Sequence, residues 1–388
     1  MPVLKVGIIG AGEVAQVIHL PTLTLLSHLY QINGICDISL PTAQHCSHKF
    51  HIPYATTDPY KIINDTNVDV VFVLTSDEFH AEYTIAALRA GKNVMVEKPL
   101  TISIPAAERI IDAEKKSRGR VFVGYMRRYA PSFTGSFLRE VASIPRILYA
   151  RVRDMSGPNA FFVNQSGTFQ VKPDVKDIPA EASQARDKLL DGLYREAFPN
   201  ASVITDEMKK YCRFLGSLGS HDLSLMREAL GGSTPSSIEG VSVNDPFYSA
   251  IFTFSPPPPT TTTTTMTPEQ AGRSFSVTYE SGIDTIPSFD AHLAIYGTNK
   301  RVSIQYDSPY VKGLPIKVHV EEVNEYDEKQ VREVLSSYED AYTAELTEMY
   351  TCFVNGKEIK TSAEDALEDL RLYDAMYRKA GISSMIRA

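Results

Sequence analysis

An apolar strand that runs into a glycine-rich turn lies a few residues from the beginning of this chain. Its sequence, Lys-Val-Gly-Ile-Ile-Gly-Ala-Gly-Glu-Val-Ala, places Gly-x-Gly-x-x-Ala between a strand and a helix-like stretch. Gly10 permits a sharp turn, Gly12 lets the main chain approach a phosphate group, and the small Ala15 lets the helix pack against the strand. The free N–H groups at the start of that helix then face an anion. The segment predicts a dinucleotide site, with cofactor contacts at Gly10, Gly12, Glu13 and Val14.

Composition narrows the class of protein further. A chain of 388 residues is long enough for two domains, and its net charge of −8 disfavours nucleic acids and anionic membranes as partners. No apolar run approaches the roughly 20 residues that span a bilayer. A first strand at about Leu4 leaves no room for a signal peptide, so we expect a cytoplasmic protein. The four cysteines show neither C-x-x-C spacing nor a Cys/His metal pattern, which predicts reduced thiols and no metal site.

Strands and helices alternate in the N-terminal part of the chain. A near-continuous apolar run such as Val-Val-Phe-Val-Leu at 70–74 suits a parallel sheet that is covered on both faces. The alternation predicts a doubly wound α/β domain of the Rossmann type over residues 1–124. The predicted strands are Leu4–Ile9, Ile32–Cys36, Val68–Leu74, Asn93–Val96 and Val121–Gly124. The predicted helices are Glu13–Ser27, Glu78–Ala90 and Pro105–Ser117.

An acidic residue follows the second predicted strand. Asp37 comes about 25 residues after the glycine turn, close to the usual spacing of the carboxylate that binds the ribose 2′-hydroxyl. The alternative role is that of a surface Asp capping the next helix. No Lys or Arg follows before Lys49, so nothing nearby in the sequence would receive a 2′-phosphate. We therefore expect NAD rather than NADP as the cofactor.

Two further segments carry the most specific signal. The predicted strand Val68–Leu74 is followed by Thr75-Ser76 and His80, and one helix later the chain reads Glu-Lys-Pro at 97–99. Together with the glycine turn, these segments resemble the Gfo/Idh/MocA family, which includes glucose-fructose oxidoreductase and inositol dehydrogenase. Ser76 stands where the family usually has proline. Packing within the helix is a competing role for His80. The resemblance implies cofactor contacts at Thr75, Ser76, His80, Glu97 and Lys98.

Lys98 is the residue that the resemblance assigns to catalysis. The carboxyl end of a strand faces the crevice in which ligands bind in open α/β sheets. Hydride transfer from a secondary alcohol needs a group that takes the hydroxyl proton. A lysine normally titrates at about 10.4, and burial or a neighbouring cationic nicotinamide would lower that pKa into a useful range. Without the resemblance, a surface lysine or a salt bridge with Glu97 would be the simpler interpretation.

A second domain is expected over residues 125–388. After Gly124 the sequence Tyr-Met-Arg-Arg-Tyr-Ala-Pro resembles the family's crossing into an α+β domain with a large, mostly antiparallel open sheet. Arg128 matches a position near the cofactor, with a structural salt bridge as the alternative. Family members commonly pair through that sheet, which implies a homo-oligomer, and a last helix at about 361–380 could pack near the first domain. The predicted strands are Arg146–Arg153, Tyr248–Phe254, Ser274–Tyr279, Ala291–Tyr296, Arg301–Tyr306 and Lys317–Glu322.

His221 takes the place of the family's second catalytic residue. It lies at the start of a predicted helix, with Ser220 as the expected N-cap and Gly231 as the end. The dipole at a helix N-terminus biases a histidine towards its neutral form, so His221 could still accept a proton. In the family two acids accompany this histidine. Ser217 and Ser224 replace them here, which puts a full proton relay in doubt.

Two side chains are expected to contact the substrate. Asp222 adjoins the catalytic histidine, and its alternative role is a dipole partner in the first helical turn. Asn159 belongs to a polar, weakly periodic insertion over residues 154–210, placed where the family builds the substrate mouth. That insertion forms a lid or specificity wall, or else a surface excursion without a role in the site. A Pro-rich and Thr-rich run at 256–265 predicts an exposed hairpin extension.

The resemblance implies an enzyme. The expected function is an NAD(P)-dependent oxidoreductase that transfers hydride between nicotinamide and a secondary hydroxyl or carbonyl of a sugar, cyclitol or related polyol. Lys98 and His221 would be its catalytic residues, and its partner a small carbohydrate-like molecule. One alternative is a non-enzymatic NAD(P)-binding regulator of the galactose-repressor type, which the serines at 217 and 224 favour slightly. Another is a reductase of an imine or enone-like centre.

Overall fold

The computed structural model describes residues 2–255 and 273–382 of the chain. These residues form two compact units, each assembled from separate stretches of sequence. Unit 1 comprises Met1–Met126, Val163–Gly216 and Tyr342–Arg371, and unit 2 comprises Arg127–Phe162, Ser217–Ala341 and Leu372–Ala388. The chain therefore passes between the units several times. The predicted hairpin extension at 256–265 lies outside the described residues.

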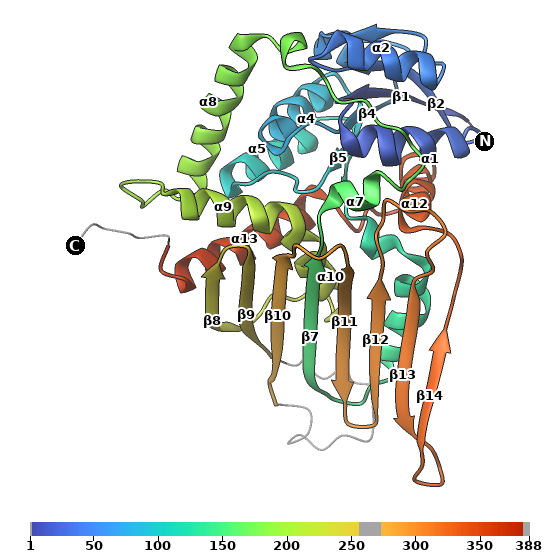
Figure 1. The fold of residues 1–388 in the computed structure, drawn as a ribbon, viewed down its shortest axis with the longest axis vertical. Coiled ribbons are helices and arrows are strands. Elements are labelled where there is room, and N and C mark those ends of the chain that lie inside the picture. Colours follow the sequence, from blue (N-terminus) through green and yellow to red (C-terminus); the bar gives the residue numbers. More distant parts are fainter. Residues whose placement is uncertain (1, 256–272, 383–388) are drawn as a thin grey trace. The chain divides into compact units, whose positions relative to one another are not determined.

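A six-stranded parallel sheet forms the centre of unit 1 (Figure 1). Its strand order is β3-β2-β1-β4-β5-β6, so the direction in which the strands are added reverses between β1 and β4. In a doubly wound sheet this reversal opens the crevice in which a ligand binds. The strands are β1 (Leu4–Ile9), β2 (Tyr30–Cys36), β3 (Ala55–Thr56), β4 (Val70–Val73), β5 (Asn93–Glu97) and β6 (Val121–Gly124). The predicted doubly wound parallel fold is confirmed, and the two-residue β3 is the one strand of this sheet that the pattern misses.

Helices connect the strands of unit 1, and their starts follow local capping rules. Ser39 and Ser103 accept the N–H groups of Thr42 (3.3 Å) and Ala106 (3.2 Å), and each cap is followed within two residues by proline. The predicted helix Glu13–Ser27 is a π-type turn followed by a short α-helix. The helical segments are η1 (Ala15–His19), α1 (Leu20–Leu25), α2 (Leu40–Lys49), α3 (Pro59–Ile63), η2 (Asp77–Phe79), α4 (His80–Arg89), α5 (Ile104–Lys115), η5 (Val175–Asp177), α8 (Ala180–Ala197) and α9 (Asp206–Phe214).

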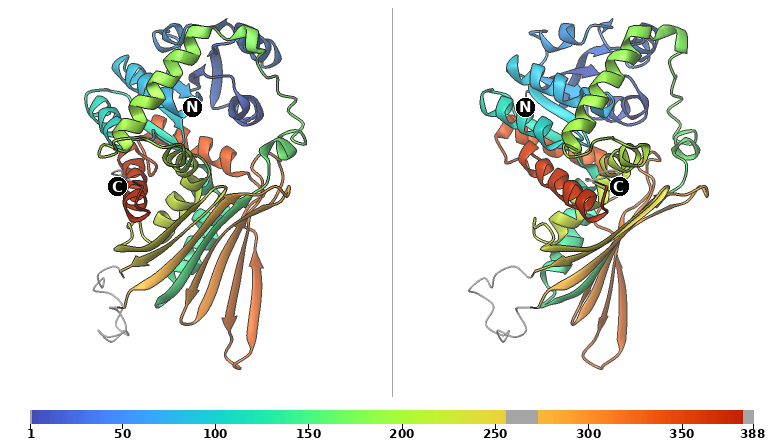
Figure 2. Two further views of the ribbon diagram at one scale, coloured as in Figure 1. Left: turned by 60° about the vertical axis from the view of Figure 1, so that its left-hand side comes forward. Right: turned by 90° about the vertical axis from the view of Figure 1, so that its left-hand side faces the viewer.

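An eight-stranded, mostly antiparallel sheet forms the centre of unit 2, and Figure 2 shows the twist of its strands. The order is β14-β13-β12-β11-β7-β10-β9-β8, with β7 and β10 as the parallel pair. The sequence missed both outermost strands, because their side chains are largely exposed and lack a clean buried alternation. The strands are β7 (Ile147–Ser156), β8 (Ser237–Asn244), β9 (Phe247–Phe254), β10 (Phe275–Ile283), β11 (Phe289–Gly297), β12 (Lys300–Tyr306), β13 (Lys317–Val323) and β14 (Lys329–Val334).

One face of this second sheet is buried and the other is polar. Along β7 the side chains of Ala150, Val152, Asp154 and Ser156 are buried, while the residues between them are half-buried. The buried face packs against helical segments, whereas the other face carries cross-strand ion pairs such as Arg151–Glu280 at 2.9 Å. The remaining helices of unit 2 are η4 (Ser132–Phe137), α6 (Leu138–Ala142) and α10 (Ser220–Ala229). Segments that cross a boundary between the units are η3 (Met126–Tyr129), α7 (Asn159–Val163), η6 (Leu215–Gly219), α12 (Ala341–Asn355) and α13 (Ala363–Lys379).

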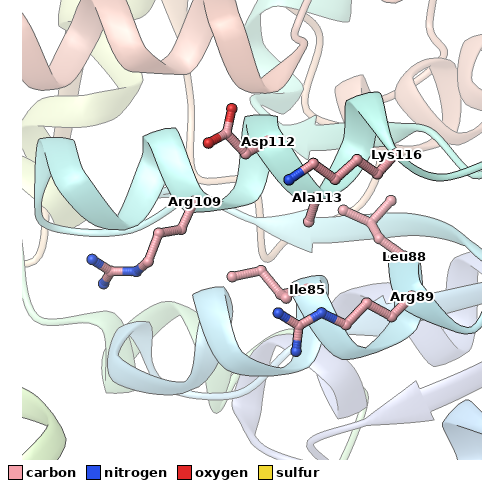
Figure 3. A pocket seen from close by; sticks show the side chains of 7 residues that line it. All are labelled: Ile85, Leu88, Arg89, Arg109, Asp112, Ala113 and Lys116. Carbon is pink, nitrogen blue, oxygen red and sulfur yellow. The ribbon is translucent and has the colours of Figure 1, made fainter.

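A groove of about 270 Å³ lies between α4 and α5 in unit 1 (Figure 3). Arg89, Arg109 and Lys116 stand around an apolar floor that includes Ile85 and Leu88. Most of these residues belong to the second halves of their helices. Because the helices of a βαβ unit run against the strands, these halves lie away from the carboxyl ends of β4 and β5. The groove is therefore separate from the dinucleotide crevice.

Candidate active site

The glycine turn after β1 has the shape that a dinucleotide requires. Gly10 has φ = +103°, and a Cβ there would lie 2.6 Å from the carbonyl oxygen of Leu74. Only glycine fits such a position. A Cβ at Gly12, in contrast, would meet no atom within 4 Å. The turn thus combines a constrained glycine with open space in front of the helix start, which fits a pyrophosphate group.

Asp37 links the glycine turn to the next strand. One carboxylate oxygen accepts the N–H of Ala11 (2.8 Å) and the other accepts the N–H of Ser39 (2.9 Å). Burial raises the pKa of the Asp37 carboxyl, and these two N–H groups act in the opposite direction. The carboxylate stands at the end of β2, where the ribose contact is predicted. Ser39, whose N–H it accepts, is the residue that caps α2.

The residues that follow β4 form a small buried network. Thr75 keeps its Oγ1 buried, and the structure gives this atom no hydrogen-bond partner among the described residues. Ser76 donates its hydroxyl to Glu78 (2.7 Å). The ring of His80, 1% exposed, lies 2.7 Å from the carbonyl oxygen of Pro99 and 3.0 Å from that of Thr75. His80 therefore ties together the ends of β4 and β5, while Thr75 Oγ1 is the group that a bound cofactor could satisfy.

Glu97, at the end of β5, is held from two sides. Its Oε1 lies 2.7 Å from Nε2 of His19, and its Oε2 accepts the main-chain N–H of Lys98 (3.1 Å). The imidazole of His19 is fully buried and meets the rings of Phe72 and Tyr342 edge-on. No local pattern predicts that His19 pairs with Glu97, which lies 78 residues further along the chain. Through this carboxyl group, the first helix positions the main chain at the candidate catalytic lysine.

The environment of His221 in unit 2 differs from the prediction. Gly219 is helical (φ −59°, ψ −29°) and the residues before it form the π-type turn η6, so Ser220 is not an N-cap. Its hydroxyl instead donates to the carbonyl of Ser217 (2.9 Å). The chain is thus already helical before His221, and the argument from a free helix N-terminus is wrong. The predicted helix end is confirmed, because Gly231 has φ = +84°.

A buried ion cluster surrounds the residue that follows His221. Nη1 of Arg127 lies 2.5 Å from Oδ1 of Asp222 and 2.9 Å from Oδ2 of Asp154. The guanidinium stacks over the rings of Phe289 and Tyr306, with 5.6 and 5.5 Å to their centroids. Burial and the neighbouring Asp154 raise the pKa of Asp222 well above its usual range, against the effect of Arg127. The sequence missed this cluster, because nothing local marks residues so far apart as partners.

The other predicted residues of unit 2 also have protein partners. Arg128 pairs with Glu228 (2.6 Å), which is the salt bridge that the sequence left open as an alternative. Asn159 donates to the hydroxyl of Tyr310 (3.3 Å). Ser224, which replaces one family acid, donates its hydroxyl to the carbonyl of His221 (3.3 Å).

Unit 1 gathers most of the predicted site at one edge of its sheet. These residues occupy the carboxyl ends of β1, β2, β4 and β5 or the turns after them, and they are Gly10, Gly12, Glu13, Val14, Asp37, Thr75, Ser76, His80, Glu97 and Lys98. In residues 2–255 and 273–382, no group of three His, Cys, Asp or Glu side chains could hold a metal ion. No helix in these ranges is both long and apolar enough to cross a membrane.

Known proteins resemble this chain in sequence along two stretches. A model of an oxidoreductase family with an NAD-binding Rossmann fold matches residues 4–125, and that family's C-terminal alpha/beta domain matches residues 206–384. A myo-inositol 2-dehydrogenase from Thermotoga maritima is 28% identical over 209 residues, covering 53% of this chain and 60% of that protein. An inositol 2-dehydrogenase from Paracoccus denitrificans is 33% identical over 156 residues, covering 39% of this chain and 46% of that protein. The matches thus span less than two thirds of these relatives.

A solved structure resembles the whole chain in fold. Levoglucosan dehydrogenase, in complex with NADH and levoglucosan, superimposes with a TM-score of 0.70 over 99% of this chain and 98% of its own. Sequence identity in that comparison is 18%, so the likeness concerns the fold. It supports the same pairing of a parallel Rossmann sheet with a mostly antiparallel sheet.

Proposed function

The chain belongs to the Gfo/Idh/MocA family of oxidoreductases, and from this premise we propose that it is an NAD(P)-dependent enzyme acting on a secondary hydroxyl or carbonyl group. The proposed substrate is a cyclitol, sugar or related polyol, in keeping with the inositol dehydrogenases among its relatives. One observation carries the proposal. The glycine turn, Asp37, Thr75 and the Glu97-Lys98 pair converge on one edge of the parallel sheet in unit 1.

The cofactor site is proposed from the residues that this edge presents. The glycine turn would hold the pyrophosphate, Asp37 the ribose hydroxyls, and the buried Oγ1 of Thr75 a polar group of the nicotinamide half. A bound nicotinamide supplies or accepts hydride. Lys98, on the turn that Glu97 steadies, would take the hydroxyl proton during oxidation or return it during reduction.

Residues of unit 2 are proposed for the substrate side by family resemblance. His221 would be a second proton-handling group, and Asp222 and Asn159 would contact the substrate. Arg128, predicted to contact the cofactor, would do so while paired with Glu228. Residues 1–124 would then be the dinucleotide-binding domain, and residues 125–388 the substrate-binding and oligomerisation domain.

Three finer features complete the proposal. NAD is preferred over NADP, because Asp37 would repel a 2′-phosphate. The protein is cytoplasmic, in keeping with four buried cysteines that form no disulfide with one another. It is a homo-oligomer that assembles through the open face of the eight-stranded sheet. Sedimentation equilibrium at micromolar concentration measures its mass in solution. The mass of a monomer would contradict this assembly.

A panel of cyclitols, sugars and polyols, offered with NAD and with NADP, tests the activity. Absorbance of the reduced nicotinamide reports turnover. Lys98→Ala should lower kcat by about 10²-fold or more, because it removes the proton-transfer group, while NADH still binds. Turnover that is unchanged in this variant would contradict the role of Lys98.

The competing hypothesis for the function of this chain is a non-enzymatic regulator that binds NAD(P). Ser217 and Ser224 stand in place of two acids, and one of them is already bonded to a main-chain carbonyl. Tight NADH binding without turnover on the whole panel would favour the regulator. Turnover of any member at more than the Lys98→Ala background would exclude it.

A further inference from the structure

Part of the chain falls between the two stretches that the family models match. Residues 126–205 belong to neither model, and their second part, from Val163, packs as an integral piece of unit 1. Figure 1 shows this part in green as an extended trace that leads from α7 into the long helix α8. Among its contacts with the rest of the six-stranded unit, two sets lie at the ends of strands of the sheet.

The first attachment is made by Gln16, on the helix that follows β1. Its Nε2 donates to the carbonyls of Ala11 (2.7 Å) and Val171 (2.8 Å), and its Oε1 accepts the N–H of Val171 (2.8 Å). The Gln16 side chain is buried, and its bond to Ala11 is buried as well, while the two bonds to Val171 are part-buried. Next to it, Gln170 donates to the carboxylate of Glu13 (3.2 Å). One side-chain amide thus joins the glycine turn to the main chain of residue 171.

The second attachment is made by Glu78, in the turn that follows β4. Its buried carboxylate pairs with Arg186 of α8 at 3.1 Å and accepts the hydroxyl of Ser76. Further along α8, Glu196 accepts the hydroxyl of Ser103 (2.5 Å), which caps the start of α5, and pairs with Arg109 (2.8 Å) within that helix. The helix is therefore fixed beside the ends of β4 and β5.

The positions of the two attachments follow the topology of the sheet. Gln16 follows β1 and Glu78 follows β4, and these are the neighbouring strands between which the strand order reverses. Ligands of open α/β sheets bind in the crevice at this reversal. The chain from residue 172 to residue 185 must therefore pass from one lip of the crevice to the other.

We propose that residues 163–197 form a cover over the dinucleotide site, with the cofactor bound between this cover and the carboxyl ends of β1 and β4. The inference rests on the proposed NAD(P) binding and adds a wall that neither family model contains. Because both ends of the cover are fastened, the cofactor leaves when an attachment opens. Gln16 and Arg186 then govern how long the cofactor stays bound.

The dissociation rate of NADH tests the cover without any substrate. The full-length protein is loaded with NADH, excess NAD is added, and the loss of bound-NADH fluorescence gives the rate constant. Gln16→Ala and Arg186→Ala should each release NADH about tenfold faster, since the first removes three hydrogen bonds to residues 11 and 171 and the second removes the ion pair with Glu78. Arg195→Ala is the matched control: Arg195 is an exposed residue of the same helix, and this variant should release NADH at the wild-type rate.

The outcomes separate the cover from the proposed function. Wild-type rates in both attachment variants, with NADH binding intact, would overturn the cover and leave the oxidoreductase proposal standing. Failure of the wild-type protein to bind NADH or NADPH would overturn both. If Gln16→Ala does not fold, Arg186→Ala decides alone, because the Arg186 side chain is 53% exposed and its replacement removes no core side chain.

Discussion

Glu97 illustrates how a buried carboxyl group is positioned one residue at a time. Both of its oxygens are engaged, one 2.7 Å from the ring of His19 and the other by the N–H of Lys98. A Cβ at Gly124 would come within 3.3 Å of the same carboxyl group, so the neighbouring strand also leaves room for it. His19 is therefore a positioning residue for the turn that carries Lys98.

Replacing His19 by phenylalanine tests this role. The variant keeps an aromatic ring against Phe72 and Tyr342 but removes the partner of Oε1 of Glu97, while Oε2 still accepts the N–H of Lys98. The free energy of unfolding in urea should fall by about 1–3 kcal/mol. His19→Gln, whose amide can replace the lost nitrogen, should recover part of that loss. A His19→Phe variant as stable as the wild type would show that the contact contributes nothing.

The buried carboxyl group of Asp222 should make the stability of the protein depend on pH. In the folded state its pKa is raised above the usual 3.8, chiefly by burial and then by Asp154. The folded protein therefore holds this proton more tightly than the unfolded chain, so this group's contribution to stability falls as the pH rises above about 4. Arg127 can balance only one of the two carboxylates.

The variant Asp222→Asn removes that titration while Asp154 still balances Arg127. Relative to the wild type, it should gain free energy of unfolding as the pH is raised from about 4 towards neutrality. Urea unfolding across this pH range measures the difference. A difference that stays constant with pH would show that Asp222 does not take up a proton on folding.

At the scale of elements, the turn between β1 and the first helix offers a matched pair of glycines. Gly10→Ala should lower the free energy of unfolding by about 2 kcal/mol or more, because φ = +103° and a contact of 2.6 Å with Leu74 both oppose a side chain. Gly12→Ala should leave stability nearly unchanged, since its Cβ enters open space. It should instead weaken NADH binding. Equal loss of stability in both variants would contradict this division of roles.

The sequence predicted elements well where the pattern was strong. The predicted bounds of β1 and β6 are those observed, because buried parallel strands have near-continuous apolar runs between turn residues. The predicted start of the helix at His221 was wrong. Ser220 is a residue type that commonly caps helices, but Gly219 before it is helical and continues the helical turn. Capping signals identify a helix start only where the chain before them leaves the helical region.

At the scale of the whole molecule, the cysteines distinguish the two units. All four thiols are buried and all belong to unit 1, and burial raises the pKa of Cys36 to about 12 and that of Cys46 to about 11. At about pH 8 few thiolates form, so Ellman's reagent should not react with the native protein. In urea, the thiols should become reactive as unit 1 unfolds. Rapid reaction of any thiol in the native protein would contradict their burial.

The sequence by itself determined the glycine turn, the alternation of strands and helices, and the family motif at 97–99. These features depend on neighbouring residues, whose steric limits and periodicity act over a few positions. Only the tertiary structure decided that His19 holds Glu97, that Arg127 joins Asp154 and Asp222, and that residue 171 is fastened to Gln16. Each of these contacts joins side chains from distant parts of the chain, and their pairing depends on how whole elements pack.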